Sequence, residues 1–235
     1  MRGSGTKTIL FLHGWGGSTD SFLGLENRFI DRYKCINLDF PPFGKSHQLK
    51  QPFSLDDYYN IANGILEVNG ITEVYVVAHS FGGRVAINLA VKTQKVKKLV
   101  ITGGAGIKPK QTLKKRFAVL KYKIAKNLVK MGALNKNSLQ RYGSTDYKAL
   151  DQNSQKTFVN IVNNNQKNML QYINAPTVLI WGQADTETPI YMGRIFNRKI
   201  KDSALVEFKG CGHFCYLERF NDFYIIVNIF FEGEN

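Results

Sequence analysis

The stretch Glu-Val-Tyr-Val-Val-Ala-His-Ser-Phe-Gly-Gly, residues 73–83, decides the fold that we predict for this chain. Its first part is a short apolar run rich in β-branched and aromatic side chains, which is typical of a strand buried on both faces. A helical pattern follows Ser80 and continues to residue 93. The stretch therefore predicts a strand, a tight turn and a helix in direct succession.

The turn around Ser80 has the composition of a nucleophile elbow. A turn this tight needs small residues two positions before and two positions after the nucleophile, and here they are Ala78 and Gly82. Glycine is the commoner residue at the first position, so Ala78 is a mild departure. Such a turn lifts the Ser80 hydroxyl out of the sheet edge and points the N–H of Phe81 at the same place. The alternative is an ordinary loop in which Ser80 has no chemical role.

Similar apolar runs recur along the chain and alternate with helical patterns. We predict strands over the ranges 6–12, 34–38, 73–78, 97–102, 176–181 and 203–208. We predict helices over the ranges 19–32, 54–69, 81–93, 189–199 and 219–231. This alternation indicates the α/β class, with a mostly parallel, doubly wound sheet of about six strands and helices on both faces.

The alternation breaks between residues 103 and 175, where no strand pattern is found. Apolar residues recur there every three or four positions and predict an amphipathic helix: Leu113, Phe117, Leu120, Ile124 and Leu128. A second helix is predicted over 145–164. At 235 residues the chain suits one domain with an insertion. We therefore expect a helical cap at 105–173, inserted between the two parts of the core, 1–104 and 174–235.

A glycine-rich loop, His-Gly-Trp-Gly-Gly-Ser at 13–18, follows the first predicted strand. An acyl-transfer site needs two N–H donors for its oxyanion, and glycines let this loop fold back so that the N–H of Trp15 meets that of Phe81. The alternative is a loop that binds nucleotide phosphates, but the Gly-x-Gly-x-x-Gly spacing and the Lys-Ser/Thr tail are missing. We expect His13 to brace the loop rather than to transfer protons.

Two loops that follow later strands carry the remaining chemistry. Asp185 comes after the predicted strand 176–181 and is the expected acid, and His213 comes after the last strand and is the expected base. Taken singly, an aspartate in a turn more often bonds to nearby backbone, and a lone histidine is more often structural. The chain order Ser80, Asp185, His213 favours a catalytic triad. The competitors for acid and base are less favourably placed: Glu187, Asp202, His47 and His79.

These motifs together resemble the α/β-hydrolase superfamily over nearly the whole chain. The similarity includes Asp-Phe-Pro-Pro-Phe-Gly-Lys-Ser at 39–46, where the family usually has Asp-x-Pro-Gly-x-Gly-x-Ser, so Pro42 replaces a glycine. The family's first antiparallel hairpin looks absent. Within the superfamily the chain is most similar to cap-bearing serine esterases and carbon–carbon bond hydrolases. Ser80 in place of an aspartate argues against epoxide hydrolases and haloalkane dehalogenases.

The residues and the resemblance imply a serine hydrolase of the carboxylesterase type. We expect Ser80 to attack a small acyl ester and form an acyl-enzyme, while His213 carries the proton and Asp185 orients the imidazole. One alternative is a thioesterase or esterase whose substrate is linked to CoA or to an acidic acyl carrier protein. Another is a C–C bond hydrolase. We expect the substrate pocket to be lined by His13, Gly14, His79, Phe117, Leu120 and Tyr142.

This chemistry needs no cofactor or metal. Cys211 and Cys215 flank His213, but the Cys-x-His-x-Cys spacing has no second half elsewhere, so no zinc site is expected. An odd number of cysteines and the lack of a signal-peptide pattern lead us to expect a cytoplasmic protein. The apolar runs are far shorter than the roughly 20 residues of a membrane span, so no transmembrane segment is expected.

Positive charge is concentrated in the predicted cap. The chain has a net charge of +14, and residues 105–172 hold 14 lysines and arginines against two aspartates, a net +12. Either this segment recognises an anionic substrate or carrier, or it is a solvated face of a lysine-rich chain. The candidate contacts are Lys114, Lys115, Arg116, Lys121 and Lys123.

The same charge permits an interpretation from a different class, a non-enzymatic module that binds nucleic acid or an anionic membrane surface. A pure binder has no use for an activated serine with an oxyanion loop beside it. We therefore favour the enzyme and expect no nucleic-acid partner.

Overall fold

A computed structural model describes residues 1–109 and 149–233, together with residues 121, 127, 129, 131, 135 and 147. Its centre is a six-stranded parallel sheet in the order β2-β1-β3-β4-β5-β6. The strands are β1 Thr8–Leu12, β2 Lys34–Leu38, β3 Val74–His79, β4 Val96–Thr102, β5 Thr177–Gly182 and β6 Ser203–Phe208. The predicted sheet is confirmed, since each strand begins and ends within two residues of its predicted range.

The strands have apolar sequences because most of them are covered on both faces. Every residue of β1 and β5 is buried, and β4 has one exposed position. Successive side chains of a strand point to opposite faces of the sheet. Accordingly, Ile9 and Phe11 of β1 enter one hydrophobic cluster, while Leu10 and Leu12 enter the other. The molecule thus has two apolar cores, one on each side of the sheet.

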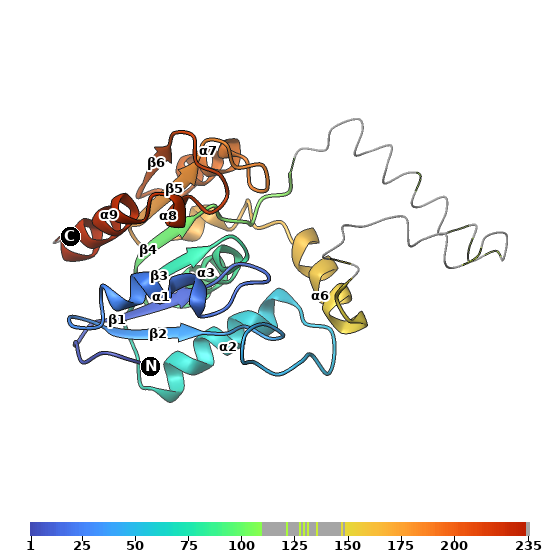
Figure 1. The fold of residues 1–235 in the computed structure, drawn as a ribbon, viewed down its shortest axis with the longest axis horizontal. Coiled ribbons are helices and arrows are strands. Elements are labelled where there is room, and N and C mark those ends of the chain that lie inside the picture. Colours follow the sequence, from blue (N-terminus) through green and yellow to red (C-terminus); the bar gives the residue numbers. More distant parts are fainter. Residues whose placement is uncertain are drawn as a thin grey trace.

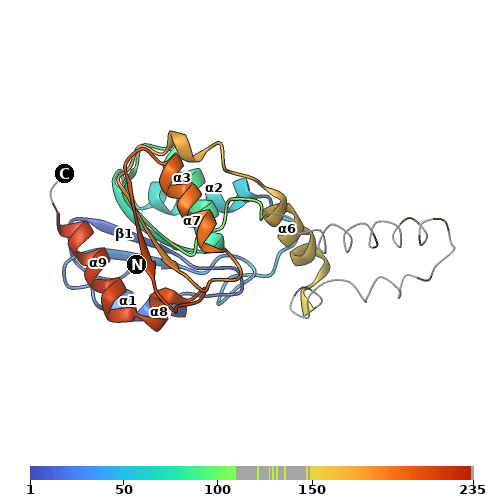
Figure 2. The same cartoon turned by 90° about the horizontal axis from the view of Figure 1, so that it is seen from above.

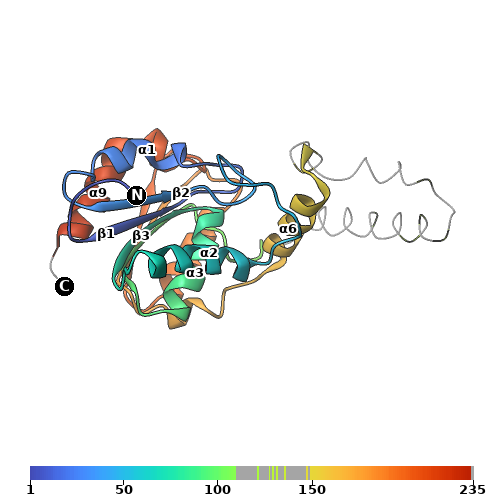
Figure 3. The same cartoon turned by 90° about the horizontal axis from the view of Figure 1, so that it is seen from below.

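Helices form the two outer layers (Figures 1 and 2). One face of the sheet is covered by α2 Leu55–Val68, α3 Phe81–Lys92 and α7 Ile190–Lys199. The opposite face is covered by α1 Asp20–Asn27, α8 Cys215–Glu218 and α9 Phe220–Glu232. A further helix, α6 Gln152–Asn163, lies beyond the end of the sheet (Figure 3).

Two helical predictions differ from the structure, and one short helix was not predicted. α1 ends at Asn27, although helix was predicted over 19–32, because the chain continues through turns that still bury Phe29 and Tyr33 in the core. α8 was not predicted, since four residues are too short to show a helical period. α6 was predicted over 145–164 but begins only after Asp151, whose carboxylate accepts the N–H groups of Asn153 and Ser154 as an N-cap.

The predicted cap lies largely outside the described residues, as does the whole amphipathic helix that we predicted from Leu113 to Leu128. Between β4 and β5 the structure describes α6 and a short 3₁₀ helix at Leu170–Tyr172. The cap at 105–173 therefore stays a prediction. None of the described helices is both long and apolar enough to cross a bilayer.

Candidate active site

Ser80 sits in a strained turn between β3 and α3. Its φ is 50°, and no other non-glycine residue in the described ranges has a positive φ; such strain typically costs about 1–3 kcal/mol. Ser80 donates its N–H to the carbonyl of Thr102 over 3.1 Å and accepts the N–H of Ala105 over 2.9 Å. Gly82 has to be glycine because an added Cβ would lie 2.1 Å from the carbonyl oxygen of Leu12. This local packing presents the Ser80 side chain at the carboxyl edge of the sheet.

The loop after β1 is shaped by a tight turn. Gly17 donates its N–H to the carbonyl of Gly14 over 3.0 Å, which leaves Trp15 and Gly16 as the central residues. Gly16 has a φ of +78°, the value that a type II turn requires at this position. The turn's own hydrogen bond does not use the N–H of Trp15, so this group is available to a ligand.

The same loop packs directly against the Ser80 turn. A Cβ added to Gly14 would lie 3.4 Å from the Cβ of Ser80, which is ordinary contact, and 2.8 Å from Nδ1 of His79, which would have to shift. The Trp15 ring meets the Phe81 ring edge-on, with centroids 5.5 Å apart. The N–H of Phe81 opens α3 and has no partner within the helix. Two backbone donors thus lie on the segments that flank Ser80.

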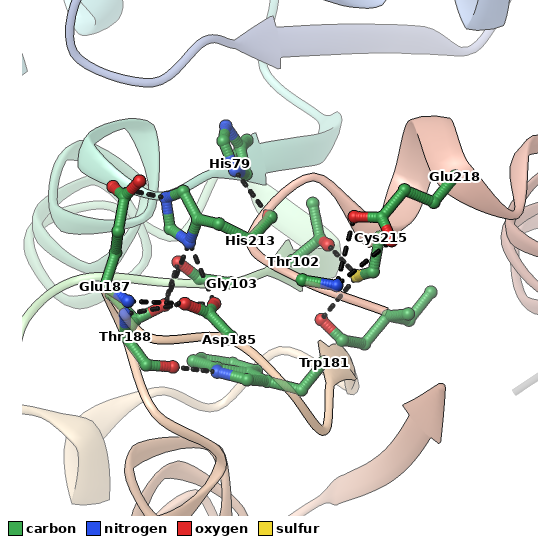
Figure 4. A network of polar contacts seen from close by, with 12 residues as sticks. His79, Thr102, Gly103, Trp181, Asp185, Glu187, Thr188, His213, Cys215 and Glu218 are labelled. Carbon is green, nitrogen blue, oxygen red and sulfur yellow. Dashed lines mark hydrogen bonds and ion pairs between the residues drawn. The ribbon is translucent and has the colours of Figure 1, made fainter. Parts of the chain in front are cut away.

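His213 and Asp185 are joined by a hydrogen bond, with 2.8 Å between Nδ1 and Oδ2 (Figure 4). Both side chains are buried, His213 at 6% exposure and Asp185 at 0%. Burial alone raises the pKa of Asp185, but hydrogen bonds from His213 and Thr188 outweigh it and hold this pKa below its ordinary value. The ionised carboxylate keeps the proton of His213 on Nδ1, which leaves Nε2 as the acceptor.

Asp185 combines two roles that the sequence presents as alternatives. Its Oδ1 accepts the N–H groups of Glu187 and Thr188, each over 2.9 Å, which is the local turn expected of a lone aspartate. Its Oδ2 is left for His213. The local turn thus aims the carboxylate at the imidazole.

Thr188 is part of this arrangement, and sequence reasoning missed it. Its hydroxyl lies 2.8 Å from Asp185 Oδ2 and 2.9 Å from the carbonyl of Gly103 (Figure 4). Its carbonyl accepts the indole N–H of Trp181 over 2.6 Å. The sequence feature that could have indicated this role is the position of Thr188, a hydroxyl residue three positions after Asp185 at the end of the aspartate's turn.

Glu187 also lies in the site, although we discounted it from the sequence. Its Oε2 is 3.4 Å from Nε2 of His213, the ring nitrogen opposite the one that Asp185 holds (Figure 4). In the described part of the chain, no hydrogen bond joins the Ser80 hydroxyl to His213 in this conformation. The other competitor, Asp202, is exposed and directly precedes β6. It therefore lies at the amino ends of the strands, whereas Ser80 lies at their carboxyl ends.

Ser80 and His213 line one cavity of about 730 Å³, within the range of about 300–1,000 Å³ that is usual for small-molecule sites. An aromatic wall surrounds Trp15, whose ring centroid lies 4.9 Å from that of Phe43 and 5.3 Å from that of Phe158. Gly14 and His79, two of the expected pocket residues, line this cavity. The site therefore combines an apolar chamber with a few polar groups at its floor.

The profile of the alpha/beta hydrolase fold family matches residues 7–122 and 108–220. These segments include the Ser80 turn and the loops that carry Asp185 and His213. The chain belongs to the α/β-hydrolase family. The predicted superfamily and fold are thereby confirmed, and the parallel sheet is the family's sheet.

Several proteins that are similar to this hydrolase over most of its length are named hydrolases or esterases. A Bacillus subtilis protein named "uncharacterized hydrolase YugF" is 25% identical, over 92% of this chain and 86% of that protein. A Burkholderia vietnamiensis 2-hydroxy-6-oxononadienedioate/2-hydroxy-6-oxononatrienedioate hydrolase is 27% identical, over 93% of this chain and 86% of that protein. An esterase structure from Exiguobacterium antarcticum, EaEST, has a TM-score of 0.78 at 18% identity, over 97% of this chain and 93% of that chain, which shows a shared fold.

Two further buried histidines pack behind the candidate site of this hydrolase and hold its loops. His79 is buried, with Nε2 3.1 Å from the carbonyl of His213 and its ring 4.7 Å from the His213 ring. Burial and the nearby His213 lower the pKa of His79 to about 3, so it is neutral. His13 is fully buried between the carbonyl of Gly14 and the N–H of Phe40. It braces the loop, but it does not line the cavity, because its ring is used in holding these two segments together.

Several predicted site residues lie outside the described residues. They are the pocket residues Phe117, Leu120 and Tyr142 and the basic residues Lys114, Lys115, Arg116 and Lys123. Lys121 is described and is exposed. The three cysteines are free and buried, and the described residues contain no cluster of three metal-binding side chains. The cytoplasmic location stays an expectation.

Proposed function

We propose that this α/β-hydrolase is a carboxylesterase-type serine hydrolase that cleaves a small acyl ester through an acyl-enzyme. The observation that carries the proposal is the 2.8 Å hydrogen bond between His213 and Asp185 beside a cavity that Ser80 and His213 both line. The strained conformation of Ser80 supports it, since strain of this kind is concentrated at functional sites.

In the proposed acylation step, Nε2 of His213 takes the proton from Ser80 as Oγ attacks the ester carbonyl carbon. The new Oγ–C bond gives a tetrahedral intermediate, whose oxyanion accepts the N–H groups of Trp15 and Phe81. The C–O bond to the alcohol then breaks, and His213 protonates the departing alcohol. Asp185 keeps the imidazole in the required tautomer and stabilises its charged form.

In the proposed deacylation step, water replaces the alcohol. His213 removes a proton from this water as it attacks the acyl-enzyme carbonyl, and the proton then passes to the Oγ of Ser80 as the carboxylic acid leaves. The Glu187 carboxylate has to turn away from Nε2, since it lies 3.4 Å from this atom in the structure. Its side chain is 65% exposed and has room to do so.

Residues 105–173 form the cap in this proposal. Leu150, Phe158, Ile161 and Val162, all from this segment, line the cavity that contains Ser80. They supply an apolar surface suited to an acyl chain. Recognition of a substrate linked to CoA or an acyl carrier protein is a variant of the proposal, and it depends on the basic residues of the same segment.

Cleavage of a carbon–carbon bond is the second candidate function. The observation that favours it is the group of relatives, 23–27% identical to this chain, that are named 2-hydroxy-6-oxononadienedioate hydrolases. The two candidates differ in the bond that breaks. Hydrolysis of p-nitrophenyl esters is compared with loss of absorbance from a conjugated 2-hydroxy-6-oxo-dienoate, and the larger kcat/KM assigns the function.

A fluorophosphonate probe tests whether Ser80 is an activated nucleophile. We expect the probe to label the protein and Ser80→Ala to abolish both labelling and ester hydrolysis. Ser4→Ala is the matched control, because Ser4 is exposed near the N-terminus. Equal labelling of the Ser80→Ala protein would refute the proposal and favour the non-enzymatic binding module.

A further inference from the structure

The cavity contains a buried cation that the proposed mechanism does not use. Arg84 lies in the first turn of α3, four residues after Ser80. The residue is 5% exposed and lines the same cavity as Ser80. A basic residue therefore forms part of the wall of the space in which a substrate of Ser80 would lie.

The charge of Arg84 has no counter-ion in the described part of the chain. One nitrogen, Nη1, donates to the carbonyl of Asn164 over 2.6 Å, and no ion pair is formed. A guanidinium has five N–H donors, so most of them lack an acceptor among the residues that the structure describes. Burial lowers the pKa of Arg84 to about 10, so the group is still charged near neutral pH.

The other charged groups of the cavity are engaged elsewhere. The Glu187 carboxylate, which lines the cavity, lies against His213, and Asp185, which lies behind His213 and does not line the cavity, is held by His213 and Thr188. A buried cation without a partner is costly to a folded protein. An anionic ligand in the cavity would remove this cost.

A structural role is the competing explanation. Asn164 is the C-cap of α6, and a cation at a helix C-terminus is stabilising. Gln166 also binds the backbone carbonyl of Arg84 over 2.9 Å and holds this part of α3. Such a clamp accounts for one N–H of the guanidinium and predicts no preference among substrates.

We infer that Arg84 binds a carboxylate of the substrate, so that the preferred esters carry a free carboxylate a few carbon atoms from the scissile bond. The inference rests on the proposed esterase function and names its substrate class. The aromatic wall around Trp15 covers the carbon chain between the two ends. The carboxylate belongs either to the acyl part, as in a dicarboxylic acid monoester, or to the leaving alcohol.

The experiment compares esters that differ in one charge. Initial rates in a pH-stat are measured for monomethyl adipate and dimethyl adipate, and for 4-acetoxybutyrate and butyl acetate. The first pair places the carboxylate on the acyl part and the second pair places it on the alcohol. We expect the unmodified enzyme to prefer the charged member of one pair by about 10–100-fold in kcat/KM, the usual effect of a hydrogen bond to a charged group.

Three variants separate recognition from structure. Arg84→Gln removes the charge and is expected to abolish the preference while the rate on the neutral ester changes by less than about threefold. Arg84→Lys keeps the charge and is expected to retain part of the preference. Arg198→Gln is the matched control, since Arg198 is exposed on α7 and lies outside the cavity. An equal loss on charged and neutral esters in Arg84→Gln would leave only the clamp and overturn the inference.

Binding provides a readout that does not need turnover. Isothermal titration of the Ser80→Ala protein with monomethyl adipate and 4-acetoxybutyrate is expected to show binding that is lost when Arg84→Gln is added. Turnover of neutral esters without any charge preference would overturn the inference and leave the proposed function standing. Arg84-dependent binding without any ester hydrolysis would overturn the proposed function and leave the carboxylate site standing.

Discussion

The carboxylate of Glu187 lies 3.4 Å from Nε2 of His213, on the side of the imidazole that faces away from Asp185 (Figure 4). His213 therefore has a carboxylate at each of its two nitrogens. Asp185 is buried and held by several hydrogen bonds, whereas the Glu187 side chain is 65% exposed. The contact of His213 with Asp185 is therefore a fixed part of the site. The contact with Glu187 competes with Ser80 for Nε2 of His213.

Removing this competition is expected to raise activity slightly. The Glu187 side of this contact is exposed to solvent and contacts of this kind are worth about 0–1 kcal/mol, so Glu187→Gln should increase kcat/KM for p-nitrophenyl acetate by about two- to fivefold. Glu73→Gln, an exposed glutamate that pairs with Lys97, is the control and should have no effect. A large fall in kcat/KM for Glu187→Gln would instead give Glu187 a positive role in the reaction.

Asp185→Asn tests the orientation of His213 with little change in shape. The asparagine oxygen can still accept the N–H groups of Glu187 and Thr188, so the local turn should persist. Its amide N–H₂ would face Nδ1 and favour the wrong tautomer. We expect kcat to fall by about 10³–10⁴-fold, as in other triads, while the melting temperature changes little. Activity within about tenfold of the unmodified enzyme would exclude Asp185 as the acid.

The buried His79 is expected to make folding stability depend on pH. Its pKa is about 3 in the folded protein and 6.5 in the reference state, so the unfolded chain binds the extra proton between these values. Stability contributed by this group is therefore present above pH 6.5 and lost as pH falls toward 3, at up to about 1.4 kcal/mol per pH unit.

Urea unfolding between about pH 4 and pH 7 measures this dependence. The slope of unfolding free energy against pH should decrease in His79→Gln relative to the unmodified protein. His47→Gln, which changes an exposed histidine, should leave the slope as it is. An unchanged slope in His79→Gln would show that other groups cause the acid sensitivity.

Two glycine substitutions should have opposite effects on stability. In Gly82→Ala the new Cβ would meet the carbonyl oxygen of Leu12 at 2.1 Å, a backbone clash that the elbow cannot relieve without moving. In Gly64→Ala, on α2, the new Cβ has nothing within 4 Å. We expect Gly64→Ala to stabilise by about 0.5–1 kcal/mol and Gly82→Ala to lower the melting temperature sharply. Similar melting temperatures for the two variants would contradict the packing described for the elbow.

Local features of the fold were predictable because neighbouring residues encode them. Strands covered on both faces need apolar side chains at successive positions, so the run before Ser80 predicted β3. A tight turn needs small flanking residues, so Ala78 and Gly82 predicted the elbow. The ends of helices were harder to predict. Buried apolar residues continue after α1 at Phe29 and Tyr33, although the backbone there is no longer helical.

The sequence by itself determined the sheet, the elbow and the chain order of Ser80, Asp185 and His213, since each depends on steric rules that act over a few residues. The tertiary structure alone decided which groups meet. Packing of distant segments places Glu187 against His213, holds His13 away from the cavity and leaves Arg84 in the cavity wall without a counter-ion among the described residues. These contacts depend on how separate strands and helices are oriented in space, and spacing along the chain does not encode that orientation.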